Sequence, residues 1–289
     1  MKHILIIGKK SYIGNSFKDY MDERHADEDW HVDFIGSSNG DWETWDFSNY
    51  DVILHVGAIV HQKERKVGEE TYRTVNYEMP VKAARKAEKH GVLQFIFLST
   101  MAVYGDVEGE ITEKTNLNPT TFYGKYKRMA EIELLCQDSQ AFKVAVIRPP
   151  MVYGKGCRGN FARLLKLSKY LGVFPKIKNK RSMIYIDNLC EYIYLTIKCE
   201  ASGVGCPQNE TWVETSDLYY RIRKGNHKKT FMTKLGNGII FLLMRNGNVF
   251  DKLFGNCYYD IKQDKDGWIP IGTKEYQAFE YAESIEQSI

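Results

Sequence analysis

Short apolar runs alternate with longer amphipathic stretches over the first 150 residues of the chain. The runs contain few polar residues, which is typical of strands covered on both faces of a parallel sheet. The strand candidates are residues 3–7, 31–35, 51–56, 94–99 and 143–148. The amphipathic stretches predict helices over residues 14–24, 70–91 and 120–136.

This alternation, with short joints between elements, predicts an α/β fold with a Rossmann-type, doubly wound parallel sheet. It weakens after Pro149 and Pro150, and residues 186–199 predict one more helix. We therefore expect a first domain over residues 1–149, to which residues 183–200 return. Residues 150–182 and 201–289 would form a smaller, mixed α/β C-terminal region that completes a cleft.

The composition places the chain among globular proteins and excludes several classes of function. Its 289 residues are 43% hydrophobic and 27% charged, and the net charge of +3 is too small to indicate nucleic-acid binding. The six cysteines form no C-x-x-C pair, so we expect no metal site and a reducing compartment.

The longest apolar run, residues 238–244, is far too short to span a membrane. It predicts a buried helix, and the alternative is a segment loosely associated with a bilayer. The first apolar run is also too short for a secretory signal. Together with the reduced cysteines, this makes the cytoplasm the expected location.

The first candidate site is "GKKSYIG", residues 8–14, which follows the first strand. In a doubly wound sheet this turn directs backbone N–H groups and a helix N-terminus at a pyrophosphate. Gly8 would permit the tight turn and Gly14 the close packing of helix on strand. Ser11 stands where a middle glycine is common, and its hydroxyl would face the phosphates.

The end of the second strand, "FIGSSNG", carries no acid to bind a ribose 2′-hydroxyl. Ser37 or Ser38, with Lys9 or Lys10, would suit either a hydroxyl or a 2′-phosphate. The sequence therefore predicts NAD or NADP as the cofactor and leaves the choice open.

The second candidate site is "YGKYK", residues 123–127, on the helix that follows Pro119. Tyr123 and Lys127 are four residues apart and project from one face. A neighbouring ammonium would lower the pKa of the phenol, which suits it to exchange a proton with a carbinol while hydride moves to a nicotinamide. Ser99 and Thr100, at the carboxyl end of the fourth strand, could hydrogen-bond the reacting oxygen.

These features together resemble the extended short-chain dehydrogenase/reductase superfamily, in particular its NAD-dependent epimerase/dehydratase family of nucleotide-sugar enzymes. The pieces that carry the resemblance are "GKKSYIG", "WDFS", "HVGA", "VN", "STMAVYG", "YGKYK", "RPPMVYGKG" and "RSMIYIDN". Their order and spacing follow the family over nearly the whole chain.

The resemblance implies a role for each matching residue. Tyr123 is the expected acid/base and Lys127 its electrostatic partner. Thr100 is the hydroxyl, and Asn76 supports the lysine through water. The expected cofactor contacts are Gly8, Lys10, Ser11, Tyr12, Ile13, Gly14, Ser37, Asp46 (toward adenine), Phe47, Val56, Gly57, Ala58, Tyr123, Lys127 and Pro150. The expected substrate contacts are Thr100, Met101, Asn160 and Arg181, with Arg181 on the diphosphate.

Substitutions within the motifs narrow the chemistry. Met101 and Ala102 stand where sugar 4,6-dehydratases of the superfamily carry Asp-Glu, so dehydration is not expected. What remains is redox chemistry at one carbinol carbon, expected to be C4 of a nucleotide sugar. UDP-galactose 4-epimerases of the family often carry a cofactor-contacting lysine shortly after the turn that corresponds to Gly57–Ala58. This sequence has Val60 and His61 there, which favours a reductase.

The main interpretation is therefore an NAD(P)-dependent C4 epimerase acting through a 4-keto intermediate. The alternative is an NADPH-dependent reductase of a nucleotide-4-keto-6-deoxy sugar. A non-catalytic NAD(P)-binding sensor is the third, which the intact Tyr123 and Lys127 disfavour. The family places such enzymes in surface-polysaccharide synthesis and leaves room for a homodimer.

Overall fold

The computed structural model describes residues 1–37, 40–60, 68–244 and 249–260. A six-stranded sheet with the order β10-β6-β4-β3-β1-β2 forms the larger half, and all its strands pair in parallel. Its strands are β1 (Lys2–Ile7), β2 (Trp30–Ile35), β3 (Val52–His55), β4 (Gln94–Leu98), β6 (Lys143–Ile147) and β10 (Gly203–Gly205). The expected doubly wound sheet is confirmed.

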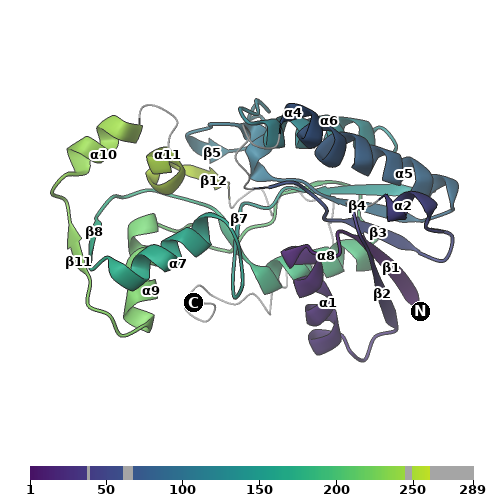
Figure 1. The fold of residues 1–289 in the computed structure, drawn as a ribbon, viewed down its shortest axis with the longest axis horizontal. Helices are drawn as coiled ribbons and strands as arrows, with labels where there is room; N and C mark the ends of the chain where they lie inside the picture. The colour runs from purple at the N-terminus through teal and green to yellow at the C-terminus, as the bar shows by residue number, and fades with distance from the viewer. Residues whose placement is uncertain (38–39, 61–67, 245–248, 261–289) are drawn as a thin grey trace.

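Helices cover both faces of this sheet (Figure 1). One face carries α1 (Tyr12–Arg24) and α8 (Ile186–Lys198); the other carries α2 (Asp41–Thr44), α4 (Glu69–Arg73), the π-helical η1 (Thr74–Glu78), α5 (Met79–Lys89) and α6 (Phe122–Leu135). Ile4 and Ile6 of β1 enter the core under α1 and α8, whereas Leu5 and Ile7 enter the opposite core. Burial on both faces is the physical reason for the uninterrupted apolar runs.

The smaller half surrounds a separate core of apolar side chains from α7, α9 and the segments between them. Its elements are β7 (Met151–Tyr153), α7 (Asn160–Tyr170), β8 (Val173–Pro175), β9 (Met183–Tyr185), α9 (Thr215–Gly225), β11 (Phe231–Thr233), α10 (Asn237–Met244), α11 (Val249–Phe254) and β12 (Cys257–Tyr259). β12 pairs with β5 (Gly109–Ile111), which follows the 3-10 turn η2 (Met101–Tyr104), so the late chain returns to the larger half. β10 also joins the main sheet, although the sequence analysis assigned residues 201–289 to the C-terminal region.

The prediction of a buried helix over residues 238–244 is wrong. α10 forms there but contains no buried residue. Ile240 and Met244 pack against the smaller core, whereas Ile239, Phe241 and Leu242 are 66%, 50% and 63% exposed. An apolar sequence shows that a helix is hydrophobic but does not show what covers it. Within the part of the chain that the structure describes, no helix is long and apolar enough to cross a bilayer.

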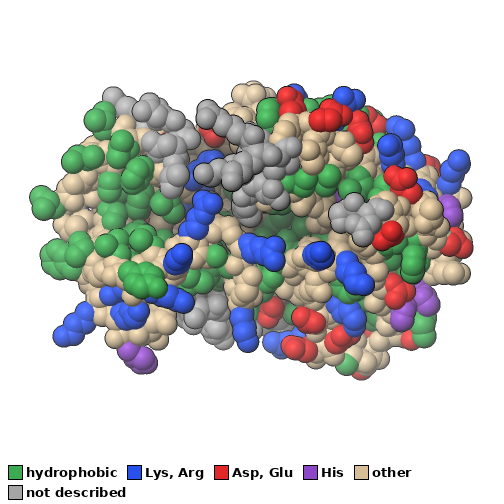
Figure 2. All heavy atoms as spheres, in the orientation of Figure 1, with side chains coloured by type: hydrophobic (Ala, Val, Ile, Leu, Met, Phe, Trp, Pro, Cys, Tyr) green, Lys and Arg blue, Asp and Glu red, His purple; other side chains and the backbone are tan. Residues whose placement is uncertain are grey.

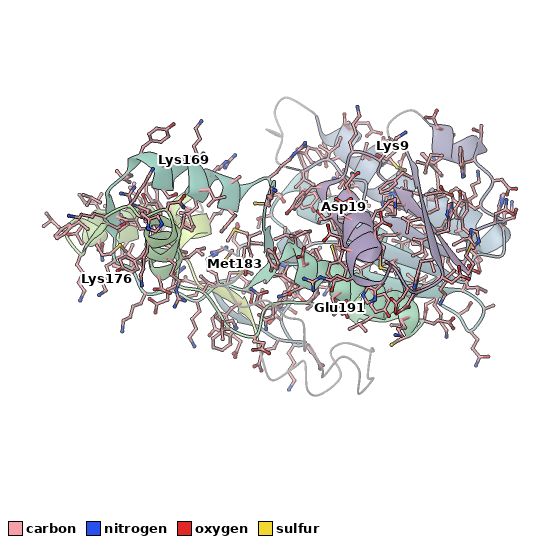
Figure 3. All side chains as sticks on the ribbon, turned by 90° about the horizontal axis from the view of Figure 1, so that it is seen from below. Lys9, Asp19, Lys169, Lys176, Met183 and Glu191 are labelled. Carbon is pink, nitrogen blue, oxygen red and sulfur yellow. The ribbon has the colours of Figure 1, made fainter. Side chains whose placement is uncertain are left out.

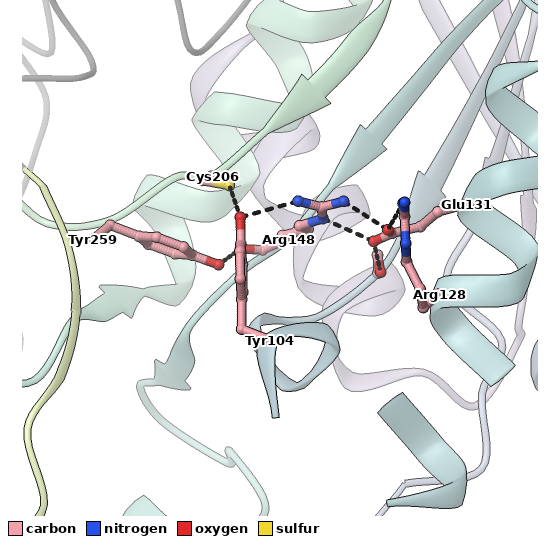
Figure 4. A network of polar contacts seen from close by, with 7 residues as sticks. Tyr104, Arg128, Glu131, Arg148, Cys206 and Tyr259 are labelled. Atoms are coloured by element: carbon pink, nitrogen blue, oxygen red, sulfur yellow. Dashed lines mark hydrogen bonds and ion pairs between the residues drawn. The ribbon is translucent and has the colours of Figure 1, made fainter. Parts of the chain in front are cut away.

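A buried ion pair joins α6 to the end of the main sheet (Figure 4). Arg148 donates to both carboxylate oxygens of Glu131, from Nε at 2.9 Å and from Nη2 at 2.7 Å. Ser99 donates to the same carboxylate, and Arg148 donates to the Tyr104 hydroxyl at 3.0 Å. Because Glu131 is fully buried, it depends on these donors to offset the loss of water.

Replacing Glu131 by Gln removes the charge opposite Arg148 while it keeps the side-chain shape. We expect the free energy of unfolding to fall by about 3–5 kcal/mol, since one buried charge loses its partner. Chemical denaturation measures this change. The matched control is Glu69→Gln, which removes the exposed partner of Lys125 and should change stability far less. Equal losses in the two variants would contradict the importance of the buried pair.

Candidate active site

The glycine loop and the end of β3 are packed directly against each other. Gly8 has φ of +133°, and a Cβ there would lie 2.9 Å from the backbone nitrogen of Gly57. A Cβ on Gly14 would lie 3.0 Å from a methyl of Ile6 and 3.1 Å from one of Val56. Only glycine suits position 8, and at position 14 a side chain would crowd Ile6 and Val56, so the turn packs closely against β3 as a dinucleotide site requires.

Ser11 ends the loop as the N-cap of α1. Its Oγ accepts the N–H of Gly14 at 3.3 Å, and its own N–H donates to Gly8 at 2.8 Å. The hydroxyl proton is still available to a phosphate oxygen. Tyr12 and Ile13 form the first turn, and Tyr12 packs against the cores of both halves. A helix N-terminus without acidic residues in its first turn suits the pyrophosphate of a dinucleotide.

The end of β2 carries the ribose-facing candidates. Ser37 packs against Gly57, where a Cβ would lie 2.9 Å from the Cβ of Ser37. Lys9 and Lys10, in the loop that follows β1, are exposed. Ser38 and His61 lie outside the described residues, so the structure leaves the choice between NAD and NADP open.

Asp46 is exposed, and its carboxylate already has partners. It accepts hydrogen bonds from the backbone and hydroxyl of Ser48 and pairs with His90 at 3.0 Å. The Ser48 bonds are the main reason why the pKa of Asp46 is lowered. The neighbouring Phe47 is fully buried under the sheet. The adenine contact of Asp46 therefore stays a prediction.

The structure brings Thr100, Tyr123 and Lys127 together at the carboxyl end of β4. The Thr100 side chain lies close enough to Tyr123 to act on the pKa of its hydroxyl. Lys127 Nζ donates to the carbonyl of Leu98 at 2.7 Å and lies 4.2 Å from the ring centre of Phe97. Ser99, the other hydroxyl considered, is bonded to Glu131 instead.

The expected lowering of the Tyr123 pKa is wrong for this structure. Burial raises the pKa of Tyr123 to about 12, although the Thr100 side chain acts in the opposite direction. Burial also lowers the pKa of Lys127 to about 7, against the attraction of Glu131. The sequence-based expectation counted the attraction between ammonium and phenolate and left out the desolvation of both groups.

Asn76 lies on η1 and is fully buried. Its side-chain amide donates to the carbonyl of Ile59 at 3.2 Å and accepts the N–H of the same residue at 2.9 Å. These bonds hold the segment after the Gly57–Ala58 turn. Support of Lys127 through water remains a prediction.

Sequence analysis missed His55, at the end of β3. It is fully buried, and neither ring nitrogen has a hydrogen-bond partner among the described residues. Burial, and then the charge of Lys127, lower the pKa of His55 to about 3, so the ring beside Lys127 is neutral. A lone histidine inside an apolar run carries no pattern that would reveal this neighbour.

Asn160 and Arg181 line one pocket of the smaller half, together with Thr215, Lys252 and Leu253. Arg181 Nη1 donates to the carbonyl of Gly255 at 3.0 Å, while its Nε has no hydrogen-bond partner in the described part of the chain. Burial lowers the pKa of Arg181. A half-satisfied buried guanidinium of this kind suits a phosphate.

Met101 connects this pocket to the reaction centre. Its sulfur lies 3.5 Å from the Sγ of Cys257, and Cys257 forms a backbone bridge with Arg181. The Met101 N–H also donates to the carbonyl of Pro149, next to the buried Pro150. The expected substrate residues Thr100, Met101 and Arg181 are therefore linked through short contacts.

A glycine turn at a strand switch point, with a hydroxyl, a tyrosine and a lysine at the same edge of the sheet, is the arrangement expected of a dinucleotide-dependent enzyme that transfers hydride. The chain belongs to the NAD dependent epimerase/dehydratase family, whose model matches residues 4–205. Membership confirms the resemblance and the expected use of NAD or NADP.

Similar proteins carry out sugar epimerisation. A UDP-glucose 4-epimerase from Vibrio cholerae is 31% identical over 303 residues, covering 94% of this chain and 92% of that protein. An Escherichia coli N-acetyl-alpha-D-glucosaminyl-diphospho-ditrans,octacis-undecaprenol 4-epimerase is 33% identical over 138 residues, covering 46% and 41%. The solved UDP-N-acetylglucosamine 4-epimerase from Methanobrevibacter ruminantium superposes with a TM-score of 0.73 at 16% identity, over 99% and 96%, and this likeness concerns the fold.

The buried Lys127 predicts a pH dependence of stability. An unfolded lysine has a pKa near about 10.4, so between this value and a folded pKa of about 7 the folded protein binds fewer protons than the unfolded chain. The contribution of Lys127 to stability therefore rises with pH across this window. The unfolding free energy of the parent protein minus that of Lys127→Met should rise from about pH 7.5 to about pH 9.5.

Urea denaturation at each pH gives this difference. Lys125→Met, which removes an exposed lysine from the same helix, is the control and should show no such rise. A constant difference for Lys127→Met over the window would show that Lys127 is charged in the folded protein.

Proposed function

We propose that this protein is an NAD(P)-dependent epimerase that inverts C4 of a nucleotide sugar, of the UDP-sugar type. The observation that carries the proposal is the meeting of Thr100, Tyr123 and Lys127 at the carboxyl end of β4, with the Arg181 pocket connected through Met101 and Cys257. Relatives named as 4-epimerases support it.

In the proposed mechanism, Tyr123 takes the proton of the C4 hydroxyl, and Thr100 hydrogen-bonds the same oxygen. A nicotinamide dinucleotide held by the turn from Gly8 to Gly14 would supply the reversible hydride transfer at C4. Tyr123 would have to be a phenolate to take this proton, and a charged Lys127, one turn later on α6, would favour that form against the effect of burial. Tyr123 then returns the proton to the product.

Arg181 would bind the substrate diphosphate through its guanidinium, whose buried Nε has no hydrogen-bond partner among the described residues, and Lys252 and Asn160 line the same pocket. The names of the Vibrio cholerae and Escherichia coli relatives share a sugar on a diphosphate and a change at C4. The diphosphate is therefore the group that we expect the pocket to recognise. Met101 and Ala102, which follow Thr100, supply no acid or base for dehydration.

The second candidate is an NADPH-dependent reductase of a nucleotide-4-keto sugar. One observation favours it: β2 ends in Gly36 and Ser37 without an acid, and Lys9 and Lys10 are exposed at the loop. The fold does not separate the two, since a dTDP-4-dehydrorhamnose reductase from Clostridium acetobutylicum superposes with a TM-score of 0.65 at 17% identity, over 80% of this chain and 82% of that one. For either reaction we propose a cytoplasmic enzyme, working as a homodimer, in polysaccharide synthesis.

Replacing Tyr123 by Phe should abolish turnover. Losing the proton-transferring group lowers kcat by about 10²–10⁴-fold, while the nucleotide still binds because the glycine loop is unchanged. Steady-state kinetics with UDP-sugars and NAD(P) titration measure both. A fully active Tyr123→Phe variant would refute the mechanism.

Cofactor retention separates epimerase from reductase. An epimerase regenerates its cofactor in each cycle, so denaturation of the purified protein should release NAD⁺ at about one equivalent. It should also interconvert UDP-sugars without added cofactor. A protein free of nucleotide that oxidises NADPH only with a 4-keto sugar would establish the reductase.

Replacing Arg181 by Met should weaken substrate binding more than chemistry. Hydrogen bonds to a charged group contribute about 1.5–3 kcal/mol, so we expect KM to rise by about 10–150-fold with a smaller change in kcat. Arg181→Lys should restore only part of the loss because it lacks the planar fork. Lys180→Met, at the exposed neighbouring position, is the control. An unchanged KM in Arg181→Met would remove Arg181 from the diphosphate site.

A further inference from the structure

The end of the molecule farthest from the main sheet exposes large apolar side chains. This apolar end surface is built by the end of α7, the β8–β11 pair, the turn after β11 and α10. Its members and their exposed fractions are Tyr170 81%, Val173 50%, Phe231 68%, Leu235 90%, Ile239 66%, Phe241 50% and Leu242 63%. Figure 2 shows hydrophobic side chains gathered over this end. A gathering of exposed apolar side chains at one end of a protein is typical of an interaction site.

α10 is the most apolar part of the surface. Every residue from Ile239 to Met244 is hydrophobic, so the helix has no polar face to present to water. Ile240 and Met244 anchor it to the smaller core, and Ile239 and Leu242 point outward into solvent. A helix that is hydrophobic all round is normally buried in protein or in lipid.

The charge of the surrounding segments is one-sided. Residues 151–185 and 218–250 hold 16 lysines and arginines and no aspartate or glutamate. The rest of the chain holds the other 24 basic residues and all 37 acidic ones. The small net charge of +3 hides this asymmetry, and Figure 3 shows Lys169 and Lys176 at the end of the molecule opposite Lys9.

We propose that the apolar end surface docks on an anionic lipid bilayer. α10 is far too short to span, so it would lie in the plane of the interface with Ile239 and Leu242 among the acyl chains. Lys229 and Lys234 precede and follow Phe231 in the sequence, and both are exposed. They would face the lipid phosphates. The excess of positive charge favours a negatively charged lipid surface over a protein partner with few acidic residues. It also disfavours a second copy of this chain, whose face would be equally basic.

Docking in this way would bring the diphosphate pocket close to the membrane. α10 packs against α11, and Lys252 and Leu253 of α11 line the pocket that contains Arg181. The proposal goes beyond the proposed function and does not depend on it, because vesicle binding is measured without substrate.

Flotation of the full chain with vesicles tests the proposal. We expect binding to phosphatidylcholine vesicles that contain about 30 mol% phosphatidylglycerol, little binding to pure phosphatidylcholine, and a decrease as salt rises from about 0.05 M to about 0.5 M. Ile239→Glu combined with Leu242→Glu should lower the bound fraction at least about tenfold. Leu93→Glu, at a residue 50% exposed on the larger half, is the matched control and should bind as the parent does.

Lys229→Glu combined with Lys234→Glu provides a second variant that leaves α10 intact, and it should also reduce binding to anionic vesicles. Unchanged thermal unfolding shows that each variant is folded. Failure of the parent protein to float, or equal flotation of all variants, would overturn the proposal. So would a parent dimer that Leu242→Glu converts to a monomer in sedimentation, since a second copy would then cover the surface.

Discussion

The buried pair between Glu131 and Arg148 is the interaction on which the site depends. Glu131 lies one turn after Lys127 and two turns after Tyr123 on α6, so whatever fixes the carboxylate fixes the rotation of the whole helix. Arg148 directly follows β6, and Ser99 directly follows β4, next to Thr100. A single carboxylate thus aligns the helix that carries the acid/base with the strand that carries its hydroxyl. Tyr259 donates to the carbonyl of Arg148, so the returning strand β12 is tied to the same point.

Close packing around the glycine loop and the end of β3 also fixes the geometry of the site. Gly8, Gly14 and Gly57 let backbone lie where side chains would otherwise stand, and Asn76 fastens the following segment through both hydrogen bonds of Ile59. The π-helical turn that holds Asn76 interrupts what is otherwise one helix from Glu69 to Lys89. Such turns often occur at functional sites because they redirect one side chain without ending the helix.

The sequence predicted the main sheet well because burial on both faces leaves an unmistakable apolar run, as in β1 and β4. The sequence also predicted that Thr100, Tyr123 and Lys127 share a site, because strand ends and helix faces follow simple periodicities. It could not predict the neighbours of Glu131 or His55, since partner choice in the interior depends on packing across distant segments. The same limit explains the wrong direction for the Tyr123 pKa and the wrong environment of α10: both depend on how much water remains around a group.

The pairing of β12 with β5 has a consequence for the order in which the protein can mature. Cys257 touches Met101 across a sequence separation of 156 residues, and the same strand supports Arg181. During synthesis, the larger half can form its sheet as soon as β10 leaves the ribosome, whereas the substrate wall waits for the last described strand. A nascent chain would therefore be able to hold its dinucleotide before it can hold a sugar.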